Sequence, residues 1–340
     1  MKTEILDSLS GSYKSAVNTA AEILKNGGTV AIPTETVYGL AADCFNEHAI
    51  KSIFTAKGRP QDNPLIVHIS DMEMLPRIAR EIPQKAYECA KRFWPGPFTM
   101  ILKRNKNVPA CVSAGLDTVA VRMPSDKTAH DIIKAADLPL AAPSANLSGK
   151  PSPTKAEHVI KDLSGKINAI VAGGDCTVGV ESTVITLVGE HPRLLRPGAV
   201  TREELIEVLP DIIVDKAVLS EPEKGEKVAS PGMKYKHYSP ETETYLVTGD
   251  SIKYADFVNG KKNAAAICFA EEYQNINIHK IVYGSGSDAA TLAKNLFAVL
   301  READGIGAEK LYVHAPDKSG VGLAVYNRLI RAAAFKVIEL

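Results

Sequence analysis

Short apolar segments alternate with segments of helical period along almost the whole chain, and this alternation limits the possible folds more than any other feature. Thr29–Pro33 and Phe98–Lys103 are apolar runs with the length of buried strands. Tyr13–Lys25, before the first run, and Glu47–Lys57, between the two runs, carry apolar residues at helical spacing, and each is followed by glycine. We therefore expect an α/β fold.

The same patterns recur up to about residue 210. Further strands are expected at Leu65–Ile69, Thr118–Met123, Leu138–Ala142, Asn168–Ala172 and Thr183–Val188, and further helices at Pro83–Phe93, Lys127–Ala136, Lys155–Asp162 and Thr201–Leu209. This order predicts a first domain with a mixed α/β sheet, over residues 1–210.

The next stretch differs, because residues 211–240 are charged, contain proline and glycine, and show neither the helical nor the strand period of apolar residues. We interpret 211–243 as a linker. Strands and helices alternate again over residues 244–340, with strands such as Ala264–Ala270 and a helix from Asp288 to Ala303. We expect a small, Rossmann-like, doubly wound second domain with a mostly parallel sheet.

Composition excludes several classes of protein. The 340 residues suffice for two cores, and 40 basic residues balance 40 acidic ones. A protein that grips nucleic acid along its length carries a basic excess, so any RNA contact should be local. No apolar run has the length of a membrane span, and the first residues do not resemble a secretory signal. The five cysteines are scattered, which favours buried thiols in a reducing cytoplasm.

Common cofactor motifs are not found in the sequence. The segment LSGK, residues 147–150, does not complete a P-loop, and GSGSDA, residues 284–289, is not GxGxxG. Histidines and cysteines show no zinc-ligand spacing. We therefore expect no zinc, flavin or NAD and no metal site made by protein alone.

Four polar segments follow strands of the first domain: PTETVYGLAADCF (33–45), KGRPQDNPLIVH (57–68), LAAPSANLSGKPS (140–152) and GGD…ESTV…RPG (173–198). In open α/β sheets, ligands bind at strand ends, so these segments could share one crevice. Each alone also has an ordinary structural explanation. Lys57 and Arg59, for example, suit the C-terminal end of a helix whether or not they bind phosphate.

Taken together, the motifs PTETVYGL, KGRPQDNPLIVHI, APSANLSG, ESTV and RPGA closely resemble the YrdC family of threonylcarbamoyl-AMP synthases. They occur in order over the whole first domain. The segment SPGMKYKHYSP, residues 230–240, resembles the linker of the longer, two-domain members. The resemblance implies a YrdC-like first domain.

It also implies an enzyme, a nucleotidyltransferase that joins L-threonine, bicarbonate or CO2 and ATP into threonylcarbamoyl-AMP with release of pyrophosphate. Mg²⁺ would accompany ATP. The product would pass to a threonylcarbamoyl transferase complex for the modification of tRNA. The mixed anhydride is labile in water, so positioning and closure should matter more than a catalytic triad.

The resemblance assigns residues to three groups. The catalytic group contains Lys57, Arg59, Ser144 and Asn146. The threonine site contains Thr36, His68, Arg122, Ala142 and Ser182, with Arg122 on the carboxylate. The ATP site contains Arg59, Asn63, Thr118, Ser144, Ser152, Arg196 and Tyr238. The alternatives are a surface charge for Arg122 and a core histidine for His68.

Two other functions stay open at this point. A YrdC-like domain could bind double-stranded RNA or ribosomes without turnover, although zero net charge disfavours that. A related domain also occurs in hydrogenase-maturation carbamoyltransferases, whose additional segments we do not find here. The patterned linker, with Tyr235, His237 and Tyr238, is further expected to act as a lid over the nucleotide rather than as a passive spacer.

Overall fold

The computed structural model describes residues 1–220 and 238–340, so most of the expected lid segment lies outside the described residues. The contacts divide the chain into two compact units. The first holds nearly all of residues 1–220. The second holds residues 238–340 together with the short segments Gly149–Pro151 and Val178–Val180.

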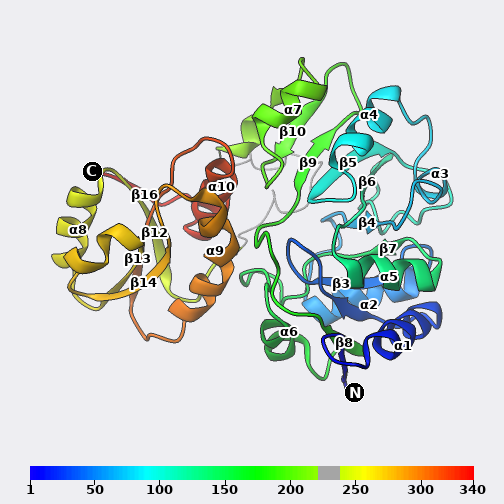
Figure 1. Cartoon of the computed structure of the whole chain (residues 1–340), viewed down its shortest axis with the longest axis horizontal. Helices are drawn as coiled ribbons and strands as arrows, with labels where there is room; N and C mark the ends of the chain where they lie inside the picture. The colour runs from blue at the N-terminus through cyan, green and yellow to red at the C-terminus, as the bar shows by residue number, and fades with distance from the viewer. Residues whose placement is uncertain (221–237) are drawn as a thin grey trace. The chain divides into compact units, whose positions relative to one another are not determined.

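The first unit is built on one mixed sheet, with strands in the order β1-β8-β2-β3-β7-β4-β6-β5-β9-β10-β11 (Figure 1). The strands are β1 (Glu4–Asp7), β2 (Val30–Ile32), β3 (Gly39–Asp43), β4 (Ile66–His68), β5 (Phe98–Lys103), β6 (Thr118–Arg122), β7 (Leu140–Ala141), β8 (Ala169–Ala172), β9 (Thr183–Thr186), β10 (Arg193–Arg196) and β11 (Ile213–Val214). The helices are α1 (Tyr13–Lys25), α2 (Glu47–Lys57), α3 (Leu75–Ile78), α4 (Gln84–Phe93), α5 (Lys127–Ala136), α6 (Ala156–Leu163), α7 (Arg202–Val208) and the 3₁₀ helix η1 (Lys216–Val218). The expected mixed α/β sheet is confirmed.

The bounds of α2 follow from its sequence. The side chain of Asn46 accepts hydrogen bonds from the backbone N–H groups of His48 and Ala49, both at 3.1 Å, and so caps the first turn. Gly58 ends the helix with φ +59°, a left-handed conformation that glycine adopts without steric cost. The chain then makes a turn through the KGRP segment, whose position is fixed by the end of the helix.

Strand β3 differs from the sequence expectation, which treated the residues after Pro33 as a turn. Gly39–Asp43 pairs antiparallel with β2, with Val30 opposite Ala41. It also pairs antiparallel with β7. The first four residues of β3 are buried, so they show no alternation of apolar and polar residues. A strand covered on both faces cannot be recognised from a two-residue alternation of apolar and polar side chains.

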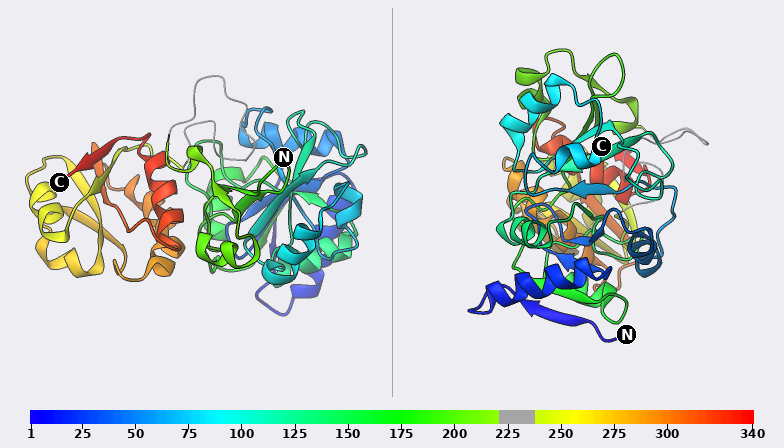
Figure 2. Two further views of the ribbon diagram at one scale, coloured as in Figure 1. Left: turned by 90° about the horizontal axis from the view of Figure 1, so that it is seen from above. Right: turned by 90° about the vertical axis from the view of Figure 1, so that its right-hand side faces the viewer.

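The edges of the sheet also contain strands that the sequence pattern did not indicate. At one edge, β1 pairs with β8 and lies beside α1 (Figure 2). At the other edge, β10 pairs with β9 and β11. Strand β11 and η1 lie beyond residue 210, so the first unit continues into the stretch that we interpreted as linker.

The second unit contains a parallel five-stranded sheet in the order β14-β13-β15-β12-β16 (Figure 1). The elements are β12 (Glu243–Thr248), α8 (Ser251–Asn259), β13 (Ala264–Phe269), the 3₁₀ helix η2 (Ala270–Asn275), β14 (His279–Gly284), α9 (Ala289–Ala303), β15 (Lys310–His314), α10 (Gly322–Ala332) and β16 (Val337–Glu339). Helix α8 lies on one face of the sheet, and α9 and α10 lie on the other. The expected doubly wound domain is confirmed.

Other expectations concern single features. The five cysteines are free, and four of them are buried. Within residues 1–220 and 238–340, no helix is both long and apolar enough to cross a membrane. In the same ranges, no group of three or more histidine, cysteine or acidic side chains could hold a metal ion.

Candidate functional site

The register of the sheet brings several expected site residues together. His68, the last residue of β4, lies opposite Arg122, the last residue of β6. Arg122 also lies opposite Thr99 of β5, which is antiparallel to β6. Strand β9 follows β5 in the sheet, so Ser182 enters the same region just before β9 begins. Four neighbouring strands therefore present polar side chains at one position of the sheet.

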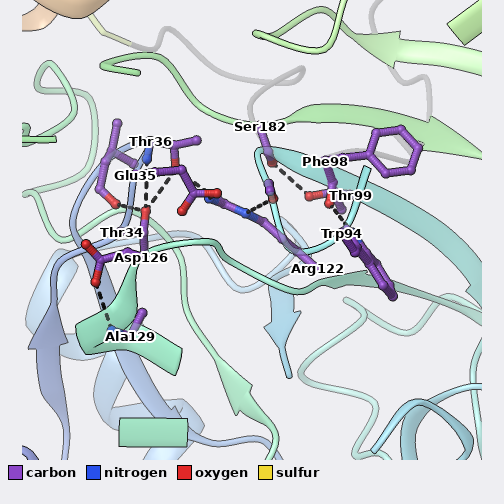
Figure 3. A network of polar contacts seen from close by, with 12 residues as sticks. Thr34, Glu35, Thr36, Trp94, Phe98, Thr99, Arg122, Asp126, Ala129 and Ser182 are labelled. Carbon is purple, nitrogen blue, oxygen red and sulfur yellow. Dashed lines mark hydrogen bonds and ion pairs between the residues drawn. The ribbon is translucent and has the colours of Figure 1, made fainter. Parts of the chain in front are cut away.

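Arg122 is the centre of this group (Figure 3). Its side chain is only 4% exposed. Its Nη1 donates to Thr36 Oγ1 at 2.8 Å, and its Nε donates to the carbonyl oxygen of Gly96 at 3.3 Å. Thr36 is held in turn by Thr34, whose hydroxyl lies 2.9 Å from the Thr36 hydroxyl. A buried guanidinium held at two points is a preorganised site for an anion.

Arg122 also faces a carboxylate that the sequence analysis did not select. Glu35 Oε1 lies 2.8 Å from Arg122 Nη2, and both side chains are buried. Burial raises the pKa of Glu35, but the Arg122 guanidinium outweighs it, so that the net pKa is lowered and the carboxyl is ionised at neutral pH. The only sequence signal for this residue is its position between the two threonines of PTET.

His68 is a neutral imidazole in this environment. Burial, reinforced by the Arg122 charge, lowers its pKa to about 3. Its Nδ1 lies 3.2 Å from the carbonyl oxygen of Ile66. A neutral ring can offer a hydrogen bond to a ligand without adding a second positive charge beside Arg122.

Ser182 and Arg196 form a second polar group next to the first. Arg196 donates from Nε to the Ser182 carbonyl oxygen at 3.0 Å and from Nη2 to the Ser182 hydroxyl at 3.1 Å. The Ser182 hydroxyl is also 2.8 Å from Thr99 Oγ1. Residues expected for threonine and for ATP thus make direct contact.

Close packing of the backbone holds this second group. A Cβ atom at Gly198 would lie 2.4 Å from the backbone nitrogen of Thr183. The RPG segment therefore approaches the ESTV segment closely because Gly198 has no side chain. Beside them, the Ser152 hydroxyl donates to Glu181 Oε1 at 2.5 Å, and both residues are buried. Glu181 is a further polar residue that the sequence analysis did not select.

Lys57 lies in the interior rather than at a helix surface. Its side chain is 2% exposed and donates to the backbone carbonyl oxygens of Ser144 and Asn146, the latter at 2.7 Å. The Ser144 hydroxyl donates to Asn146 Oδ1 at 2.6 Å. Lys57, Ser144 and Asn146 therefore form one connected group, in which the lysine fixes the loop that follows β7.

The remaining expected residues lie around these groups. Arg59 Nη2 donates to the carbonyl oxygens of Asn63 at 3.4 Å and Pro64 at 3.2 Å, which keeps the KGRPQDNP turn compact. The backbone N–H of Ala142 donates to the Ile66 carbonyl oxygen at 2.9 Å, next to His68. Thr118 begins β6, so it lies about 13 Å from Arg122 along the strand, at 3.3 Å per residue.

Tyr238 is described within the second unit. Its ring lies 5.3 Å from the ring of Phe297 and 5.7 Å from the Arg328 guanidinium carbon. Its φ of +63° is in the left-handed region, which is rare for a side chain of this size. These contacts do not test its expected role with ATP.

The fold and these groups define a two-domain α/β protein with a buried, arginine-centred cluster of polar side chains in its first domain. Two family models match the chain. The telomere-recombination model of the Sua5, YciO and YrdC proteins matches residues 22–198, and the threonylcarbamoyl-AMP synthase C-terminal domain matches residues 200–334. The chain belongs to the Sua5/YciO/YrdC family. The resemblance found in the sequence is confirmed.

Similarity to individual relatives extends over both domains. A threonylcarbamoyl-AMP synthase of Pyrococcus abyssi is 44% identical, over 95% of this chain and 96% of the relative. A threonylcarbamoyl-AMP synthase of Bacillus subtilis is 43% identical, over 94% of this chain and 93% of the relative. The crystal structure of Pyrococcus abyssi Sua5 complexed with L-threonine is 40% identical, covers 100% of both chains and has a TM-score of 0.91.

Proposed function

We propose that this protein is an L-threonylcarbamoyl-AMP synthase. The observation that carries the proposal is the similarity to enzymes of that name at 44% and 43% identity over nearly the full length of both chains. The solved relative was crystallised with L-threonine, which supports threonine as a substrate here as well. The proposed reaction converts threonine, bicarbonate and ATP into threonylcarbamoyl-AMP, pyrophosphate and water.

The threonine site is proposed to centre on Arg122. Its Nη2 contacts the Glu35 carboxylate at 2.8 Å, and its planar guanidinium is suited to a substrate carboxylate. Thr36 fixes the guanidinium, and the neutral His68 and Ser182 lie where they could meet the substrate hydroxyl. Ala142 offers only a methyl group, which suits contact with the methyl group of threonine.

The nucleotide site is proposed to include Arg59, Asn63, Thr118, Ser144, Ser152, Arg196 and Tyr238. Arg196 contacts Ser182, so the triphosphate and the amino acid would lie side by side. Lys57 and Asn146 shape the loop that carries Ser144. Mg²⁺ is proposed to arrive with ATP and to neutralise charge on the phosphates.

The chemistry then depends on positioning. The threonine amine and CO2 or bicarbonate form a carbamate, whose oxygen attacks the α-phosphorus of ATP as pyrophosphate leaves. The arginines stabilise the charge that moves onto the phosphates, as preorganised donors do in acyl and phosphoryl transfer. A buried site also protects the mixed anhydride from water. The adenylate is proposed to pass, in the cytoplasm, to a threonylcarbamoyl transferase complex that modifies tRNA.

One assay tests this proposal. The protein is incubated with labelled bicarbonate, ATP, Mg²⁺ and L-threonine, and the adenylate is followed by chromatography together with pyrophosphate release. We expect a labelled adenylate that requires threonine. Pyrophosphate release that is the same with and without threonine, or no release from a folded protein, contradicts the proposal. Binding of double-stranded RNA by such an inactive protein would instead favour the non-catalytic alternative.

A further inference from the structure

Glu35 and Arg122 form a buried pair whose contact is incomplete. Their side chains are 7% and 4% exposed, and Glu35 Oε1 lies 2.8 Å from Arg122 Nη2. Within residues 1–220 and 238–340, Glu35 Oε1 and Oε2 and Arg122 Nη2 have no hydrogen-bond partner of good geometry. The Glu35 carboxylate is stabilised mainly by Arg122, with smaller contributions from backbone groups of Ser125 and Glu35. A buried carboxylate is stabilised further by a ligand that adds hydrogen-bond donors, so this arrangement is suited to such a ligand.

Glu35 is not required to orient Arg122. The guanidinium is already fixed by its hydrogen bonds to Thr36 Oγ1 and to the Gly96 carbonyl oxygen. Figure 3 shows the Glu35 carboxylate next to the Arg122 guanidinium, whose Nη2 it contacts. An anionic acceptor and a cationic donor therefore lie side by side in the interior, joined by a single ion-pair contact.

An α-amino acid carries its ammonium and its carboxylate on a single carbon atom. We propose that Glu35 binds the α-ammonium of the substrate while Arg122 binds its α-carboxylate. The inference rests on the proposed function, because it assigns a role within the threonine site. The pair has no net charge, so it matches a zwitterion, whereas Arg122 alone would accept any small carboxylate.

Discrimination by Glu35 can be measured without turnover. L-threonine is compared with (R)-3-hydroxybutyrate, which keeps the carboxylate and the hydroxyl but lacks the ammonium. Isothermal titration calorimetry, without ATP or bicarbonate, gives both affinities for the unmodified protein and for Glu35→Gln. We expect the unmodified protein to bind threonine at least tenfold more tightly than the analogue. We expect Glu35→Gln to lose that preference while its affinity for the analogue changes less than threefold.

A matched control removes a neighbouring carboxylate that has another role. Asp126 precedes α5 as its N-terminal cap, and its side chain accepts a hydrogen bond from the Ala129 N–H at 2.9 Å. Asparagine caps helices equally well, so Asp126→Asn should fold and keep the preference for threonine. Retention of the preference in this control shows that a lost charge near the site does not by itself remove discrimination.

Two results overturn the inference. Equal weakening of both ligands by Glu35→Gln means that the carboxylate acts only through Arg122. Equal affinity of the unmodified protein for both ligands excludes an ammonium site, even if the Glu35 variant does not fold. A protein that neither binds threonine nor makes the adenylate contradicts the proposed function itself. A protein that makes the adenylate yet shows no preference contradicts only the role of Glu35.

Discussion

The Lys57 ammonium and the Asn146 backbone carbonyl oxygen are hydrogen-bonded at 2.7 Å inside the first unit. This contact joins the end of α2 to the loop after β7, which are separated by almost ninety residues of chain. The family resemblance placed Lys57 in a catalytic group. Its first role in the structure is to fix the loop that carries Ser144 and Asn146.

Replacement of Lys57 by methionine should therefore lower stability as well as activity. Lys57→Met keeps the aliphatic stem but leaves two buried carbonyl groups without their donor, at a cost of about 1–3 kcal/mol. For a domain of this size, that lowers Tm by roughly 2–4 °C per kcal/mol. Thermal unfolding measures it. Lys51→Met, on the exposed face of the same helix, should leave Tm unchanged within a degree or two.

Replacement of Arg122 by lysine should weaken threonine binding at least tenfold. The charge is kept, but a lysine cannot make two parallel hydrogen bonds to a carboxylate, and each bond to a charged group contributes about 1.5–3 kcal/mol. The dissociation constant of threonine, from calorimetry, checks this. Arg77→Lys changes an exposed arginine paired with Asp137 and should bind threonine normally. Unchanged affinity in Arg122→Lys would exclude the carboxylate assignment.

Replacement of Arg59 by alanine should reduce the use of ATP at least tenfold, because a charge-assisted hydrogen bond to phosphate is lost. The KM for ATP is measured at saturating threonine. Arg77→Ala is the control, since its ion pair with Asp137 is exposed. Normal ATP kinetics in a folded Arg59→Ala variant would remove Arg59 from the proposed nucleotide site.

Valine should be a poor substrate and serine a better one. A site that pairs a hydroxyl rejects an analogue lacking it by a large factor, whereas the loss of one methyl group in a pocket costs only about 1–3 kcal/mol. Pyrophosphate release with each amino acid measures the preference. If valine were turned over as fast as threonine, the polar side chains around Arg122 would not contact the substrate hydroxyl.

The stability of the protein should fall between pH 6.5 and 5 through His68. Its pKa is about 3 in the folded chain and near 6.5 in an unfolded one, so the unfolded state binds more protons in this window. The free energy of unfolding is highest, with respect to His68, above pH 6.5, where the ring is neutral in both states. It falls by up to about 1.4 kcal/mol per pH unit below that.

Denaturant unfolding at several pH values measures this dependence. His68→Gln should reduce the loss of unfolding free energy between pH 6.5 and 5. His279→Gln, at an exposed strand position, should leave that loss unchanged. A His68→Gln variant with the same pH dependence as the unmodified protein would show that His68 is not held neutral. Glu35 does not titrate in this window, because the Arg122 guanidinium keeps its pKa below the usual value.

Most helices and strands of both units could be predicted because local chemistry specifies them. Tyr13–Lys25 has helical spacing, Asn46 and Gly58 bound α2, and the apolar run Phe98–Lys103 gives β5. These features depend on residues a few positions apart, so the sequence displays them directly. The motifs that identified the family are also contiguous in sequence. The two-domain α/β fold follows from the order of the apolar and helical segments and from the irregular stretch between the two domains.

Only the tertiary structure decided how these segments combine. Strand β3 has no alternating pattern because it is buried between β2 and β7. Neither the pairing of Glu35 with Arg122 nor the burial of Lys57 against Asn146 follows from any local signal, since the partners are far apart in sequence. Burial in the folded core removes water from these charges and thereby determines which side chain each one contacts and what its pKa becomes.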